Sequence, residues 1–130
     1  MARTSSVKGD TLTFRNEGTA ESQGVMNISY AGFRTAIMSV LNPLMLYDEL
    51  FVASGAFRHI EIETTPGTLN RAQWPAGCSP GGTTNIEFSI GLIQDIMMRM
   101  LSASPELKGD IVSDTPSLST MAQAGVDQWG

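Results

Sequence analysis

The sequence contains one cysteine, Cys78, and one histidine, His59. A single cysteine excludes an intrachain disulfide framework and any zinc site built from several cysteines. A single histidine excludes two-histidine metal motifs and leaves a serine-histidine-aspartate triad dependent on one residue. No apolar run reaches the roughly 18 residues that a membrane helix needs, and the first residues lack the apolar stretch of a secretory signal. These absences predict a soluble domain with no membrane partner; the sequence indicates no cofactor and assigns no metal site.

Charged residues are also few, and basic residues are fewer than acidic ones. Only 16% of the 130 residues are charged, with 8 Lys plus Arg against 13 Asp plus Glu, so the net charge is −5. A free-standing, generic nucleic-acid binder would be expected to have a basic excess instead. A small monomer normally carries nearer a quarter of its residues as charges. The shortage therefore favours an obligate oligomer, in which part of the surface is covered.

The order of elements along the chain predicts the α+β class, with an antiparallel β-sheet, an N-terminal hairpin and two C-terminal helices. We expect a single domain over residues 1–130. Residues 1–10 are small and polar and indicate a flexible arm. Residues 11–90 form the sheet, interrupted by a Gly- and Pro-rich loop at 64–83, and 91–130 form a helical region.

Alternating apolar residues predict the strands. Residues 11–15 and 25–30 alternate and are expected to pair as the hairpin. Residues 57–63 and 84–90 alternate as well, and 84–90 is the most regular of the four.

The middle of the chain is less clear, because Asn42-Pro43 interrupts an apolar run and proline disfavours helical geometry in the residue before it. Residues 33–41 therefore indicate either a strand or a short helix, and 44–53 a separate element. Farther along, apolar residues recur at helical spacing and form a broad stripe. Its members are Leu92, Ile93, Ile96, Met97, Met100 and Leu101. Ser104-Pro105 then has the residue types that begin a further helical turn.

One group of residues has the types needed for chemistry. His59, Glu61 and Glu63 are spaced by two, so on a strand their side chains leave from the same face. An imidazole and two carboxylates could hold a divalent cation or pair an acid with a base. The alternative is that they form the solvated face of a half-buried strand, with Ile60 and Ile62 facing the core. No second group of ligands in the sequence completes a site.

Several features together resemble the coat proteins of single-stranded RNA bacteriophages. Gly9-Asp-Thr-Leu-Thr13 leads into a hairpin, as the first strand of some members does. The 64–83 loop is similar to the loop that gathers around the symmetry axes of those shells. The passage 84–103, followed by Ser104-Pro-Glu-Leu107, resembles their closing strand and helix pair.

This resemblance implies a non-enzymatic structural protein of a virion, assembled in the cytoplasm of a bacterial host. Two chains would join their sheets and interlock their C-terminal helices, with the stripe at 92–101 as the dimer interface. Dimers would close into an icosahedral capsid around single-stranded RNA, and Cys78 would be placed to link neighbouring subunits. The residues implied to bind RNA are Arg15, Arg34, Arg58 and Arg71.

Two other functions remain open at this stage. One is a small α+β enzyme or metal-dependent binding domain that uses His59, Glu61 and Glu63. The other is an adaptor that presents a methionine-lined surface, through Met97, Met98 and Met100, to a partner helix.

Overall fold

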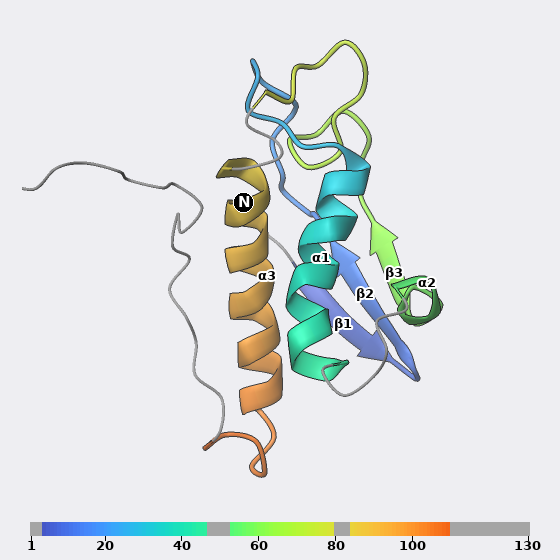
Figure 1. Cartoon of the computed structure of the whole chain (residues 1–130), viewed down its shortest axis with the longest axis vertical. Helices are drawn as coiled ribbons and strands as arrows, with labels where there is room; N and C mark the ends of the chain where they lie inside the picture. The colour runs from blue at the N-terminus through green and yellow to red at the C-terminus, as the bar shows by residue number, and fades with distance from the viewer. Residues whose placement is uncertain (1–3, 47–52, 80–83, 110–130) are drawn as a thin grey trace, which may run out of the picture.

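The computed structural model describes residues 4–46, 53–79 and 84–109. Figure 1 shows a small sheet with the longest two helices packed beside one another and with the loops gathered at one end. In chain order the elements are β1 (Thr4–Lys8), β2 (Thr11–Arg15), α1 (Tyr30–Met45), α2 (Ala53–Ala56), β3 (Ile60–Glu63) and α3 (Thr84–Ser102).

The N-terminal hairpin is built from β1 and β2. The two strands pair antiparallel, with Lys8 opposite Thr11, so Gly9-Asp10 is a two-residue turn. Gly9 has a φ of +67°, which glycine adopts without the steric cost that a Cβ would impose. The hairpin therefore differs from the predicted one. Residues 4–8 are a strand where a flexible arm was expected, and the second strand expected at 25–30 is a loop over 25–29 followed by the first residue of α1.

The sheet has the order β1-β2-β3, and its two pairings differ in direction. β2 and β3 run parallel, with Leu12 opposite Ile60 and Phe14 opposite Ile62. A parallel pair needs a crossover connection, and α1 and α2 supply it here. The sequence predicted a sheet that is antiparallel throughout. The parallel pairing of β2 with β3 differs from that prediction. The sequence pattern could not reveal this, because alternation is the same in both directions.

α1 continues through Pro43, where the sequence indicated a break. Its residues in the core cluster recur at helical spacing and explain why a helix forms; they are Phe33, Ala36, Ile37, Val40 and Leu41. Ser29 caps the helix, its Oγ accepting a hydrogen bond from the Gly32 N–H at 3.1 Å. Pro43 lies in the last turn, so the helix lacks one hydrogen bond near its end, but it continues far enough for the Leu46 N–H to reach the Asn42 carbonyl at 3.0 Å. The predicted element at 44–53 falls largely outside the described residues.

α3 begins at Thr84, so the strand predicted at 84–90 is wrong. The alternation there is part of a longer helical repeat in which spacings of three and four residues alternate. The residues of that repeat that pack in or against the core are Ile86, Ile90, Ile93, Met97 and Met100. Phe88, which a strand would have placed beside Ile86 and Ile90, is 51% exposed.

The core lies between β2, α1 and α3 (Figure 1), and Phe14 joins the helical residues there. Ile93 and Met97, which the sequence assigned to a dimer interface, are buried inside their own chain. Leu92, Ile96, Met100 and Leu101 are half-buried. The interlocked dimer and the single domain stay predictions. The C-terminal helical region beyond residue 109 lies outside the described residues. No helix in the described part is long and apolar enough to span a bilayer.

Buried side-chain amides form hydrogen bonds between the loop before α1 and the loop before α3. Asn27 is fully buried; its Oδ1 accepts from the Gln23 N–H at 2.9 Å, and its Nδ2 donates to the Gly77 carbonyl at 2.7 Å. Asn16 donates from Nδ2 to Asn70 Oδ1 at 2.7 Å. These bonds join residues 16–27 to residues 70–77 and fix the loop end of the molecule.

Replacing Ile93 with alanine should lower the free energy of unfolding by about 2–5 kcal/mol, since it leaves a cavity in the core. Urea unfolding followed by circular dichroism measures the change. Leu107→Ala is the control, because that side chain is 41% exposed, and it should cost about 0.5 kcal/mol or less. Equal losses in the two variants would contradict the placement of Ile93 in the core.

Asn27→Ala should lower the free energy of unfolding by about 1–3 kcal/mol, because it leaves buried backbone groups without their partners. The same urea titration applies. Gln73→Ala serves as control, since this side chain is exposed in the same loops. An unchanged midpoint for Asn27→Ala would show that the loops hold together without this amide.

Candidate functional site

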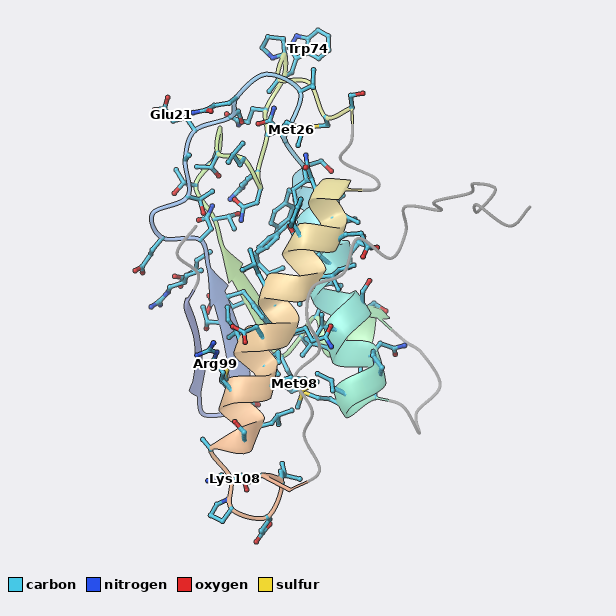
Figure 2. All side chains as sticks on the ribbon, turned by 90° about the vertical axis from the view of Figure 1, so that its left-hand side faces the viewer. Glu21, Met26, Trp74, Met98, Arg99 and Lys108 are labelled. Carbon is cyan, nitrogen blue, oxygen red and sulfur yellow. The ribbon has the colours of Figure 1, made fainter. Side chains whose placement is uncertain are left out.

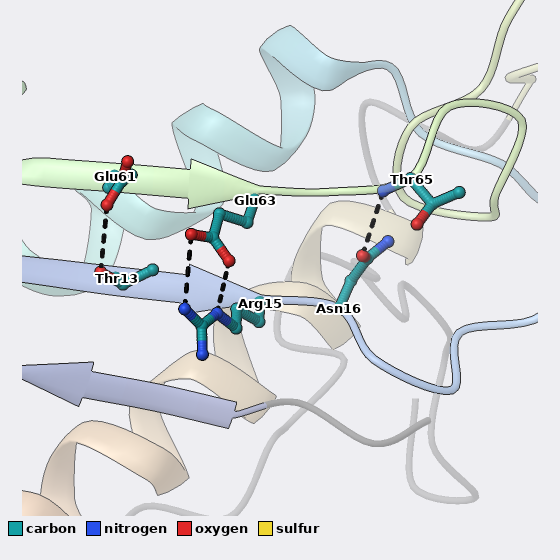
Figure 3. Close-up of polar contacts among 6 residues, drawn as sticks. All are labelled: Thr13, Arg15, Asn16, Glu61, Glu63 and Thr65. Atoms are coloured by element: carbon teal, nitrogen blue, oxygen red, sulfur yellow. Dashed lines mark hydrogen bonds and ion pairs between the residues drawn. The ribbon is translucent and has the colours of Figure 1, made fainter.

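His59, Glu61 and Glu63 do not form a common site. Each is engaged by a different residue of the neighbouring strand or its turn, as Figure 3 shows for the two carboxylates. Thr13 Oγ1 donates to Glu61 Oε2 at 3.5 Å, and Arg15 forms an ion pair with Glu63. His59 precedes β3, and its Nδ1 lies 3.6 Å from Asp10 Oδ2.

The Arg15 guanidinium makes Glu63 a poor proton donor or acceptor. Its hydrogen bonds hold the pKa of the Glu63 carboxyl below the usual range, so the group is ionised at neutral pH. Within the three described stretches, no three His, Cys, Asp or Glu side chains are grouped closely enough to hold a metal ion. This face of the sheet is therefore a row of cross-strand polar pairs.

The four arginines predicted to bind RNA are spread over several elements. Arg15 pairs with Glu63, Arg34 lies over the Phe57 ring at 4.0 Å, and Arg58 is exposed. Arg71 donates to the Thr64 carbonyl at 2.6 Å and lies 5.0 Å from the centroid of the Tyr30 ring. Binding of RNA by these arginines is not tested by the structure. Cys78 is exposed, and its role as an inter-subunit link stays a prediction.

A pocket of about 580 Å³ lies between the loops and the first half of α3. We call it the loop–helix pocket. Its walls are mainly apolar and come from both sides: Met26, Ile28 and Leu69 from the loops, and Phe88 and Leu92 from α3. Figure 2 places Met26 in the loops beside the start of this helix.

Two asparagines give the loop–helix pocket its distinctive chemistry. Asn70 is 1% exposed, and its Oδ1 is occupied by the bond from Asn16. Its Nδ2 has no hydrogen-bond partner among the described residues, and neither has the buried Nδ2 of Asn85, in the first turn of α3. Buried amide donors are almost always paired in folded proteins. Both of these unpaired nitrogens belong to residues that line the pocket, and each is covered by surrounding protein atoms.

Two other cavities lack this feature. One, of about 440 Å³, is apolar and lies where α1 and α3 end, with His59 and Asp10 at its edge already facing one another. The other, of about 370 Å³, surrounds the Arg15–Glu63 pair, whose charges satisfy each other. The loop–helix pocket is therefore the best candidate site in the described part of the chain.

Sequence reasoning missed both asparagines. Asn70 stands in a stretch that reads as an irregular loop, and Asn85 in a stretch that alternates like a strand. Neither belongs to a motif, and only the folded contacts show that their donors are unpaired.

Comparison with known proteins corrects the predicted identity. The family model described as hydantoinase B/oxoprolinase matches residues 1–123. No match was found among curated proteins or among solved structures. The family match overturns the resemblance to phage coat proteins, and with it the capsid function and the virion location.

The same match corrects the expectation that the chain is not an enzyme, because this is a family of enzymes. The resemblance was wrong because it depended on the order of elements, and the strand at 84–90 that supported it is a helix. The match covers nearly the whole sequence, and the chain belongs to the hydantoinase B/oxoprolinase family.

Proposed function

We propose that this chain takes part in the hydrolysis of a small cyclic amide and that the loop–helix pocket holds the ring. The class of substrate follows the family description, which names hydantoins and oxoproline through their enzymes. The observation that carries the proposal is the pair of unpaired Nδ2 donors, on Asn70 and Asn85, beside an otherwise apolar pocket.

The dimensions and surface of the pocket suit such a ring. Ligand pockets are concave and mainly apolar, with a small number of polar groups that fix the orientation of the ligand. The loop–helix pocket has that composition, with Met26, Leu69 and Phe88 among its walls. At about 580 Å³ it is large enough for a five-membered ring and its substituents.

The reaction explains why amide donors are useful there. Hydrolysis adds water to a ring carbonyl carbon and breaks its bond to the ring nitrogen, which takes up a proton. Negative charge develops on the carbonyl oxygen, and a side-chain N–H held away from water stabilises that charge. The role proposed for Asn70 and Asn85 is to bind and polarise the carbonyl oxygens.

The rigidity of the site supports the same role. Asn70 is held by Asn16 and by Thr68, whose Oγ1 lies 3.1 Å from Asn70 Oδ1. Asn85 belongs to a helix packed on the core. Donors that are fixed before the substrate arrives need little reorganisation during the reaction.

Filling the pocket should weaken ring binding. We expect hydantoin or 5-oxoproline to bind the chain in isothermal titration calorimetry, and Leu92→Trp to weaken that binding at least about tenfold, since the indole would occupy the pocket. Leu101→Trp is the matched control, because Leu101 lies on the same helix and lines the separate apolar cavity. It should bind the ring as the parent chain does.

Circular dichroism establishes that both variants fold. The proposal fails if the parent chain binds neither ring, or if the two tryptophan variants lose binding equally.

A further inference from the structure

We infer that the loop–helix pocket selects an uncharged ring amide and disfavours a ring that carries a carboxylate. Hydantoin belongs to the first class and 5-oxoproline, at neutral pH, to the second. This inference rests on the proposed function, since it names the kind of substrate for the same pocket.

The first argument is the absence of charge in the lining. Every residue that lines the pocket within the described stretches is neutral, including its polar members Gln23, Asn70, Asn85 and Ser89. A carboxylate moved from water into such a site loses its hydration and gains no opposite charge, which is strongly unfavourable. A neutral ring loses only the hydration of its amide groups, and the two donors replace that.

The arginine that is nearest to Asn70 in the sequence already has other partners. Arg71 follows Asn70 directly, but its guanidinium donates to the Thr64 carbonyl at 2.6 Å and to Thr64 Oγ1 at 3.3 Å, and it lies over the Tyr30 ring. It lines the small polar cavity around Arg15 and does not line the loop–helix pocket. Recruiting it to a ligand carboxylate would break these contacts.

The start of α3 could in principle attract an anion, since a helix N-terminus carries partial positive charge. Glu87 stands in that first turn. Its carboxylate offsets part of that positive charge. The helix end therefore offers a bound carboxylate little stabilisation.

The number of donors agrees with an uncharged diamide. Asn70 and Asn85 each have an unpaired Nδ2, and a hydantoin ring has two carbonyl oxygens to accept from them. A ring with one carbonyl and one carboxylate would place its charge against a neutral amide or an apolar wall. The pairing of two neutral donors with two neutral acceptors leaves none of these groups unsatisfied.

The test compares charged and uncharged probes on the intact chain. Hydantoin, 5-oxoproline and 5-oxoprolinamide, the uncharged amide of the second probe, are titrated at neutral pH by isothermal titration calorimetry. The inference predicts that hydantoin and 5-oxoprolinamide bind at least about tenfold more tightly than 5-oxoproline. Equal or tighter binding of 5-oxoproline would overturn the inference while leaving the proposed function intact. Binding of none of the three would overturn both.

A variant tests whether the Asn85 donor contributes to hydantoin binding. Asn85→Leu removes the donor and keeps the approximate size of the side chain, so hydantoin should bind about tenfold more weakly, the loss of roughly one hydrogen bond. Asn42→Leu makes the same exchange on α1 outside the pocket and should leave hydantoin binding unchanged. Undiminished binding by Asn85→Leu would contradict the assigned role.

Discussion

The loop before α1 and the loop before α3 are held in position by buried side-chain amides, above all by Asn27 and the Asn16–Asn70 pair. Loops rarely bury their backbone, because its polar groups then need partners. Here Asn27 bonds to the backbone of its own loop and to Gly77 in the other, so the segments are held as one unit. That unit supplies one wall of the loop–helix pocket, and α3 supplies the opposite wall. The shape of the pocket therefore depends on the hydrogen bonds that hold the loop unit in place against the helical core.

The buried amides divide into a fully paired group and an incompletely paired group. Asn27 has partners for both ends of its amide, and Asn16 donates to Asn70 and accepts the Thr65 N–H at 3.2 Å (Figure 3). Asn70 and Asn85 keep one unpaired donor nitrogen each. A satisfied buried amide adds rigidity, whereas an unsatisfied one is costly unless a ligand completes it. This contrast supports our proposal that the pocket binds a ligand that accepts hydrogen bonds.

Local patterns predicted part of the local structure and did not predict the distant contacts. The strand at 11–15 and the helical stripe at 92–101 follow from periodicity and are present. Periodicity failed at 84–90, where a seven-residue alternation was part of a helix, and at Pro43, which the last turn of α1 accommodates. The site was beyond reach, because Asn16 and Asn70 are 54 residues apart in sequence and neither stands in a motif. A resemblance drawn from element order alone likewise misidentified the family.

The central claim is that Asn70 and Asn85 present free amide donors to a bound ring. The most direct measurement is the ¹⁵N NMR spectrum of the side-chain amides, recorded with and without hydantoin. The account predicts that the Asn70 and Asn85 signals shift on titration, whereas the signal of Asn27, whose amide is already paired, stays in place. Saturable hydantoin binding that leaves the Asn70 and Asn85 signals unmoved would contradict it.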